Sequence, residues 1–228
     1  MKDIHGKAIL DYYQGKEESS LILHTSYGES EEMPVEVFFR DELDFKTLEH
    51  LALIECSGKV LDLGAGAGAE ALVLQSRGFE VYALEYSPGC VQVMQQSGVD
   101  HVLFEDYRTH HGKYDTILAL MNGLGLAGTL AGVPAFLTKC MSLLNPGGQL
   151  LIDSSDISYL YEDGLEKPAG YYGEVRYQYE YQGERGDWFD WVYVDQETLA
   201  EIVGKLGLLL EILMTDENDQ YLARITKG

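Results

Sequence analysis

The residues of clearest chemical interest lie in a glycine-rich stretch and at one acidic position beyond it. Residues 59–63 form a short, largely apolar run, and Gly64, Gly66 and Gly68 follow it directly before a helix-forming segment. Glycines let the backbone turn sharply and approach a ligand closely, and the free N–H groups that begin a helix point back at that ligand. The order of strand, glycine turn and helix therefore predicts a nucleotide-binding βα unit.

Glu85 is the acidic position that fits this unit. Residues 79–84 read as a second strand, and this strand ends on Glu85. An acid about 20 positions beyond the glycine turn is placed to accept hydrogen bonds from two ribose hydroxyls. An acid that ends a strand is often simply solvated, but the spacing from Gly64 favours the ribose-binding role.

The run from Val60 to Gly68 resembles the first motif of class I S-adenosylmethionine-dependent methyltransferases. It differs from the turn of dinucleotide dehydrogenases in carrying an acid, Asp62, before Gly64 and in the close spacing of Gly66 and Gly68. The resemblance implies an α/β fold, a Rossmann-like, doubly wound and mostly parallel seven-stranded sheet with an antiparallel last strand. It also implies an enzyme of class EC 2.1.1.-, which moves a methyl group from S-adenosyl-L-methionine to a small-molecule acceptor by direct displacement.

The same resemblance assigns parts of the cofactor, and of its product S-adenosyl-L-homocysteine, to residues. Asp62 would act on the amino group of the methionine tail, or hold the glycine turn through backbone N–H groups. Tyr86 would cover the adenine ring, and Asp106, with Glu105 as the alternative, would accept a hydrogen bond from the adenine amino group. The cofactor-binding residues expected on this basis are Asp62, Gly64, Ala65, Gly66, Gly68, Glu85, Tyr86, Asp106, Tyr107 and Met121.

The end of the fourth strand is where the family places residues near the transferring methyl group. This chain has Asn122 there, in a stretch rich in glycine. The Asn122 amide has one acceptor and two donors, so it could orient a substrate amine or hydroxyl, or it could cap the loop. The Asn/Asp-Pro-Pro-aromatic run of amino-methylating nucleic-acid enzymes is absent, which argues against a base-methylating enzyme.

Two other classes of function stay open at this point. One is a protein that binds S-adenosylmethionine or S-adenosylhomocysteine without turnover, as a regulator or scaffold. The other is a nicotinamide-dependent oxidoreductase. The ligand that stabilises the fold would separate the oxidoreductase from the other two.

The composition of the chain limits which binding partners, metals and cellular compartments we expect. The 228 residues carry a formal net charge of −22, which repels phosphate backbones and anionic lipid and so excludes nucleic acid and membrane as expected partners. The three cysteines are far apart in sequence and form no metal-binding or redox pair, and the adjacent His110 and His111 point apart, so we expect no metal site. With no signal-peptide pattern at the start of the sequence, a cytoplasmic location is the expectation.

The stretch before the first core strand, residues 1–57, is expected to be a helical extension that covers the cofactor as a lid. A helix is predicted over 5–13, an extended segment over 34–40, and a second helix over 41–54. The aromatic residues of this stretch could face the active site or pack the extension onto the core. The candidates to contact substrate are Tyr12, Tyr13, Phe38, Phe39 and Arg40.

Residues 58–228 are expected to form the cofactor-binding domain, with an insertion at about 154–194. Strands are predicted over 101–104, 114–120 and 149–152, with helices between them, as in a parallel sheet wound on both faces. Within the insertion, 172–181 and 188–194 alternate like two paired strands. This hairpin could form the floor of a small-molecule pocket, or it could pair with another subunit in a homodimer.

Overall fold

A computed structural model describes residues 2–16, 20–161 and 167–228 of the chain. Internal contacts divide the chain into two compact units, and each is described separately. The first unit contains Met1–Lys46, Leu61–His110 and Arg176–Phe189. The second unit contains Thr47–Val60, His111–Val175 and Asp190–Gly228.

The strands of the main sheet follow the order β11-β12-β7-β6-β3-β4-β5, which makes seven strands within the described residues. The pair β4 and β5 is parallel, and so is the pair β6 and β7. The last strand, β12, runs antiparallel to both of its neighbours, β7 and β11. The predicted Rossmann-like, mostly parallel α/β fold with an antiparallel last strand is therefore confirmed.

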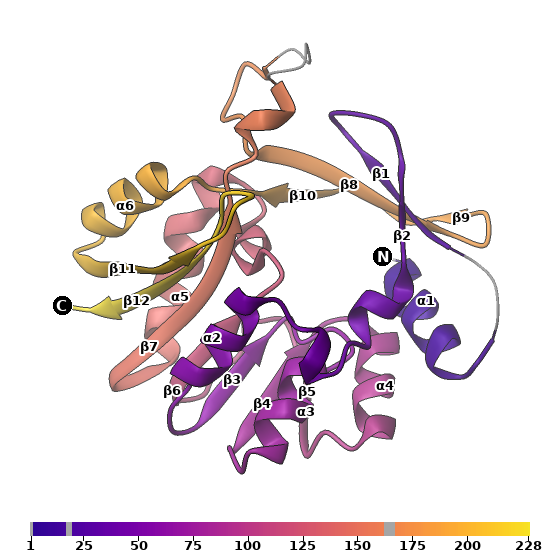
Figure 1. The fold of residues 1–228 in the computed structure, drawn as a ribbon, viewed down its shortest axis with the longest axis horizontal. Helices are drawn as coiled ribbons and strands as arrows, with labels where there is room; N and C mark the ends of the chain where they lie inside the picture. Colours follow the sequence, from indigo (N-terminus) through magenta and orange to yellow (C-terminus); the bar gives the residue numbers. More distant parts are fainter. Residues whose placement is uncertain (1, 17–19, 162–166) are drawn as a thin grey trace. The chain divides into compact units, whose positions relative to one another are not determined.

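The first unit contains the predicted βα repeats. Its elements are β3 (Val60–Leu63), α3 (Ala69–Ser76), β4 (Val81–Glu85), α4 (Pro88–Ser97) and β5 (His101–Phe104), with α3 and α4 packed on β4 (Figure 1). Helix α4 begins as the sequence indicates, because the Ser87 side chain caps it and a proline takes its first position. It ends at Gly98, whose φ of 90° is the left-handed conformation that glycine tolerates.

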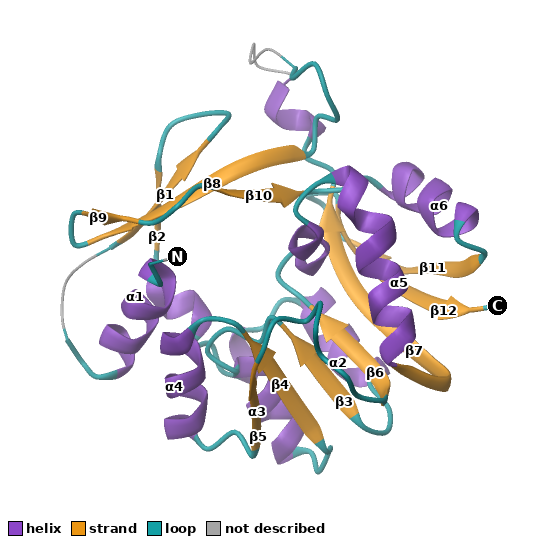
Figure 2. Cartoon of the chain, turned by 180° about the vertical axis from the view of Figure 1, so that it is seen from behind, coloured by secondary structure: helices purple, strands orange, loops and turns teal. Residues whose placement is uncertain are grey.

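The second unit contains the other half of the repeats. Its elements are α2 (Thr47–Glu55), β6 (Tyr114–Ala119), α5 (Val133–Leu143), β7 (Leu144–Ser155), β10 (Phe189–Val192), α6 (Gln196–Lys205), β11 (Leu208–Thr215) and β12 (Gln220–Lys227). Helix α5 packs against β7, and α6 packs against β11 (Figure 2). Buried apolar side chains such as Leu150, Leu151 and Leu222 have less than 1% of their surface exposed and form the core.

The stretch before the first core strand is more varied than the predicted helical extension. It contains α1 (Ile4–Tyr13), β1 (Leu21–Thr25) and β2 (Glu31–Met33). The extended segment predicted over 34–40 is wrong, because Val35–Phe38 is a 3-10 helix that buries Val35. The single helix predicted over 41–54 is wrong as well, since a short 3-10 helix capped by Asp41 ends at Asp44 and α2 begins only at Thr47.

The predicted pairing of strands within the inserted segment is present, since β10 and β8 are neighbours in one sheet, but the segment does not fold as an isolated hairpin. Strand β8 (Glu174–Tyr181) pairs with the two-residue strand β9 (Glu184–Arg185) and also, antiparallel, with β1. The register of the second pair joins Ile22 to Glu180 and Thr25 to Tyr177. Strands from the two ends of the sequence thus lie side by side in the first unit (Figure 1).

Candidate functional site

The glycine turn after β3 has the backbone geometry that a close ligand approach requires. Gly64, Gly66 and Gly68 have φ values of 75°, 54° and 87°, a region that other residues enter only with strain. The amides of Gly64 and Ala65 both donate to the carbonyl of Leu84, at 2.9 and 3.2 Å, which joins the turn to the end of β4.

The glycines of the turn have different surroundings. A Cβ atom on Gly66 would meet no other atom within 4 Å, so the backbone at this residue faces open space. A Cβ atom on Gly68 would lie 2.8 Å from Cγ of Met94 in α4. Gly66 therefore borders a surface that a ligand can approach, whereas Gly68 permits close packing of α3 against α4.

Three carboxylates lie around this turn. Asp62 is only 4% exposed, and its Oδ2 atom is buried with no hydrogen-bond partner among the described residues. Burial raises the pKa of Asp62 well above its usual value, and the nearby charges of Glu70 and Glu85 raise that pKa further. The guanidinium of Arg40 lies 3.9 Å from Glu70. A cationic amino group bound here would supply the partner that Asp62 Oδ2 lacks.

Glu85 ends β4 with its carboxylate turned toward the glycine turn. Oε2 accepts a hydrogen bond from the amide of Gly66 at 3.0 Å. Oε1 accepts from the amides of Tyr86 at 2.7 Å and Ser87 at 2.9 Å. Burial raises the pKa of Glu85, and these amides act in the opposite direction. Because a carboxylate has about four acceptor sites and these amides use three of them, Glu85 retains about one site to accept from a ligand hydroxyl.

The residues expected around adenine are found at the ends of β4 and β5. Tyr86 is 64% exposed, and its ring centroid lies 6.3 Å from that of Phe104. Asp106 accepts hydrogen bonds from the backbone and the guanidinium of Arg108, at 2.9 and 3.1 Å. Glu105 instead binds His110 at 2.9 Å, and Tyr107 lies under the Arg108 guanidinium. Both candidate acids therefore have protein partners, and their contact with adenine stays a prediction.

The aromatic residues expected in a lid stack on one another in the first unit. The ring centroid of Phe39 lies 4.9 Å from that of Tyr12 and 6.3 Å from that of Tyr13. Phe38 and Phe39 also pack against an apolar cluster that includes Ile9. Arg40 donates from Nε to the carbonyl of Val37 at 2.8 Å and lies over the ring of Phe45. These contacts agree with the packing alternative, and a role toward substrate stays a prediction.

The end of β6 in the second unit carries an unusual backbone. Met121 and Asn122 are consecutive non-glycine residues with φ values of 59° and 58°. This conformation costs a residue such as Met121 about 1–3 kcal/mol and occurs at functional sites, whereas asparagine tolerates it. Oδ1 of Asn122 accepts a hydrogen bond from Oγ of Ser155 at 2.7 Å, and Oδ1 of Asp153 accepts from the amide of Gly123 at 2.9 Å. Side chains at the end of β7 thus hold the turn that presents Asn122.

The sequence interpretation missed Asp153 as well as two residues at the start of the chain, the α1 N-cap Asp3 and His5. Asp153 is 1% exposed, and burial raises its pKa to about 6. Asp3 binds Ser87 across 84 positions, and His5 lies between the rings of Phe38 and Tyr179 at centroid distances of 4.9 and 5.1 Å. Burial lowers the pKa of His5 to about 4. No periodicity or spacing marks these residues, because their partners are distant in sequence.

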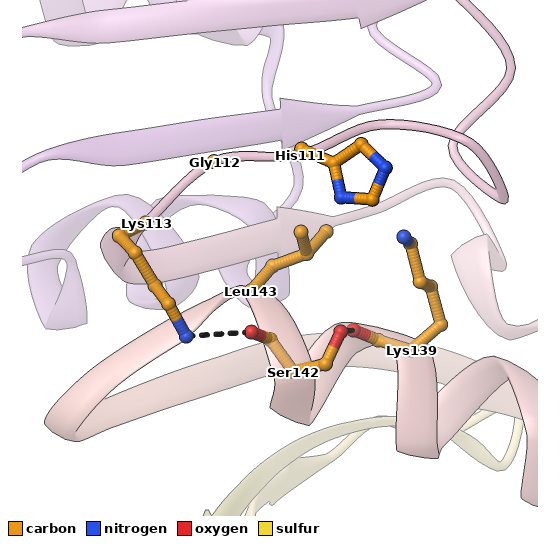
Figure 3. Close-up of a pocket in the computed structure, with 6 residues that line it drawn as sticks. All are labelled: His111, Gly112, Lys113, Lys139, Ser142 and Leu143. Carbon is orange, nitrogen blue, oxygen red and sulfur yellow. Dashed lines mark hydrogen bonds between the residues drawn. The ribbon is translucent and has the colours of Figure 1, made fainter.

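Another part of the second unit holds a cavity of about 480 Å³ (Figure 3). Its lining residues are His111, Gly112, Lys113, Lys139, Ser142 and Leu143. Lys113 donates from Nζ to the carbonyl of Ser142 at 2.8 Å, which caps the end of α5. The cavity lies where β6 begins, whereas ligands of such sheets bind beyond the carboxyl ends of the strands, so we do not take it as the functional site.

Within residues 2–16, 20–161 and 167–228, histidine, cysteine and acidic side chains form no group that could hold a metal ion. Among the helices described, none has both the length and the apolar composition needed to cross a membrane.

The residues of the first unit fit the parts of S-adenosylmethionine. The cofactor has an ammonium group, a ribose and an adenine, and the unit offers an unpartnered buried Asp62 oxygen, the Glu85 carboxylate and the exposed Tyr86 ring. The open face of Gly66 leaves room for a ligand against the backbone. Cofactor and residues are therefore compatible in charge and in space.

Comparison with known proteins identifies the family of this chain. The family model described as "Methyltransferase domain" matches residues 38–211. A crystal structure of a SAM-dependent methyltransferase from Bacteroides fragilis in complex with S-adenosyl-L-homocysteine is 38% identical and has a TM-score of 0.93. That match covers 100% of this chain and 95% of the other. A search of curated proteins found no match.

More distant solved structures share the fold alone. The CcbJ methyltransferase from Streptomyces caelestis is 15% identical, with a TM-score of 0.62 over 79% of this chain and 94% of its own. The sugar N-methyltransferase KedS8 from Streptoalloteichus sp ATCC 53650 is 14% identical, with a TM-score of 0.57 over 89% of this chain and 96% of its own.

Proposed function

This chain belongs to the S-adenosylmethionine-dependent methyltransferases, and from that premise we propose that its methyl acceptor is a small molecule bound beside Asn122. The family match makes the protein an enzyme of the general class EC 2.1.1.- with S-adenosylmethionine as cofactor. When bound, the cofactor supplies an electrophilic methyl group on a sulfonium, which the acceptor's nucleophile displaces directly.

The residues of the first unit would hold the cofactor. We assign its amino group to Asp62, its ribose hydroxyls to Glu85 and its methionine tail to the turn from Gly64 to Gly68. The buried Oδ2 of Asp62 supports this assignment, because an unpaired carboxylate oxygen in a dry position is costly unless a cation joins it. The exposed Tyr86 and the side chains of Asp106 and Tyr107 are assigned to adenine.

The observation that carries the acceptor assignment is the left-handed turn at Met121 and Asn122. The hydroxyl of Ser155 donates a hydrogen bond to the amide oxygen of Asn122. The Asn122 side chain therefore offers its N–H donors to a ligand. A donor at this point would orient an acceptor through an oxygen or nitrogen lone pair. Orientation, rather than a dedicated base, is what a displacement from a sulfonium chiefly needs.

A role for residues 1–57 as a cover of the cofactor stays part of this proposal. Arg40 is its leading candidate for a carboxylate of the cofactor or substrate, since a guanidinium binds a carboxylate through two parallel hydrogen bonds. The anchoring of α1 on α4, described below, means that any movement must occur in the segment after α1. Tyr12 and Tyr13 belong to α1 and would stay with it, so Phe39 would move relative to the rings on which it stacks.

The proposal extends to the class of acceptor, the cellular compartment and the oligomeric state. The net charge of −22 supports a small-molecule acceptor over a nucleic acid. The three cysteines are free and buried, which supports a reducing compartment such as the cytoplasm. A homodimer through the inserted hairpin would have to use a surface other than the edge of β8 that β1 already covers, and light scattering would detect it.

Transfer of tritiated methyl from S-adenosylmethionine to a panel of amines, phenols, thiols and carboxylates tests the proposal. DNA, RNA and a mixed protein substrate complete the panel. We expect label in one small-molecule class, and lower incorporation with Asn122→Ala at unchanged affinity for S-adenosylhomocysteine. Label in nucleic acid or protein only would overturn the acceptor assignment.

A further inference from the structure

We propose that Asp3 is a positioning residue of the cofactor site, which holds Ser87 so that the Ser87 amide fixes the carboxylate of Glu85. The inference rests on the ribose-binding role proposed for Glu85 and extends the site to the first helix of the chain. Every group involved belongs to the first unit.

The carboxylate of Asp3 caps two helices at once. Oδ1 accepts from the amide of Gly6 at 3.0 Å, which begins α1. Oδ2 accepts from the amide of Gly89 at 2.9 Å, in the first turn of α4. The hydroxyl of Ser87 lies 2.9 Å from both oxygens. Since orphan N–H groups at helix starts attract a negative charge, one side chain ties the beginning of α1 to the beginning of α4.

The backbones of α1 and α4 are in close contact beside Asp3. A Cβ atom on Gly89 would lie 2.1 Å from the carbonyl oxygen of Gly6, so the two helices meet backbone to backbone. Ile4 and Ile9 of α1 are buried in one cluster with Cys90 and Val93 of α4. Asp3 is therefore set at a rigid helix junction.

Ser87 connects this junction to the cofactor acid. Its hydroxyl binds Asp3, while its amide donates to Oε1 of Glu85 at 2.9 Å. Because the hydroxyl and the amide of Ser87 are both bound, the Glu85 carboxylate keeps one orientation. Its Oε2 atom then accepts from the amide of Gly66 at 3.0 Å. The ribose acid and the glycine turn are thus held in register by a residue near the start of the chain.

The charge of Asp3 acts on Glu85 as well. The ionisable groups that face Glu85 are Asp3 at the N-cap of α1, Asp62 from β3 and Cys90 from α4. Asp3 contributes to the raised pKa of Glu85, although burial is the larger cause. Removing the charge of Asp3 would let Glu85 ionise at lower pH, which a purely structural cap would not do.

Calorimetric binding of S-adenosylhomocysteine between about pH 5 and pH 8 tests the proposal. We expect Asp3→Ala to raise the dissociation constant about three- to tenfold at neutral pH, because Glu85 loses its fixed orientation. Asp3→Asn still caps α1, so it should weaken binding less than alanine does. As the pH is lowered, Asp3→Asn should lose affinity for S-adenosylhomocysteine at a lower pH than the natural protein does.

Asp11→Asn is the matched control, since Asp11 lies on the same helix but contacts Lys16 and Tyr181. It should leave both affinity and pH profile unchanged. Glu85→Ala is measured in parallel, and unchanged affinity there would refute the role of Glu85 itself. If Glu85→Ala loses affinity while the Asp3 variants bind normally, or weaken equally at every pH, Asp3 is not a positioning residue.

Discussion

Cγ of Met94 lies 2.8 Å from the position that a Cβ atom on Gly68 would occupy. The third glycine of the motif is therefore required by packing between α3 and α4. Gly66, two residues earlier, has no such neighbour and borders open space. One motif thus combines a structural glycine with a glycine that a ligand can approach, and substitutions should separate the two.

Gly68→Ala should lower the free energy of unfolding by about 2–4 kcal/mol, since a methyl group overlaps Met94 and φ is unfavourable. Gly66→Ala should cost only about 1–2 kcal/mol, because strain at φ is the single penalty. Urea denaturation measures both. Met94 is fully buried, so Met94→Ala is destabilising by itself. The double change Gly68→Ala with Met94→Ala should therefore cost less than the sum of the two single losses, and equal losses for the two glycines would contradict this reading.

Gly66→Ala should nevertheless lose more affinity for S-adenosylhomocysteine than its small effect on stability suggests. The added methyl group would project into the open space through which a ligand reaches the backbone. Calorimetry on the folded variant measures the loss. Gly78→Ala is the control, because Gly78 also has a positive φ and open surroundings but ends α3. Equal affinity of the two variants would show that Gly66 is not next to the ligand.

Glu85→Ala should weaken S-adenosylhomocysteine binding by about tenfold to several hundredfold, since hydrogen bonds to a charged group contribute about 1.5–3 kcal/mol each. The empty protein should also lose some stability, because three backbone amides lose their acceptor. Titration calorimetry and thermal melting measure the two effects. Glu80→Ala, at an exposed acid just before the same strand, should change neither.

Met121→Gly should raise the free energy of unfolding by up to about 1 kcal/mol, because glycine adopts a φ of 59° without the strain of a side chain. The side chain is 40% exposed, so little packing is lost. Leu120→Gly, at the preceding residue, should destabilise instead. A loss of stability in Met121→Gly as large as that of Leu120→Gly would show that the turn stores no strain.

The raised pKa of Asp153 predicts a dependence of stability on pH. The folded state binds the Asp153 proton more tightly than the unfolded chain does, so this contribution to stability is complete below the usual pKa of 3.8. It is lost as pH rises toward about 6, the pKa in the fold. The loss amounts to at most about 3 kcal/mol, at 1.36 kcal/mol for each unit of pKa.

Asp153→Asn removes this titration and is the comparison that isolates it. Urea denaturation of both proteins at about pH 4.5 and pH 7 should show a smaller decline in the variant. The buried amide of the variant can still accept from the amide of Gly123. An identical decline in the two proteins would show that Asp153 does not titrate in this range.

Local pattern was sufficient to predict the cofactor half of the protein. The glycine spacing, the acid at Asp62 and the strand that ends on Glu85 all lie within one βαβ unit, where neighbours in sequence are neighbours in space. The signals that begin and end α4, Ser87 and Gly98, are local for the same reason. These features led to the methyltransferase family and the cofactor, which the comparisons confirm.

Tertiary structure alone decided the contacts that join distant parts of the chain. Nothing in local spacing pairs Asp3 with Ser87, or β1 with β8, because these partners are separated by 84 residues and about 150 residues respectively. The segment over 34–40 reads as extended, yet it forms a 3-10 helix once Val35 is buried. The left-handed turn at Met121 and Asn122 is likewise held by Asp153 and Ser155, which come from another strand.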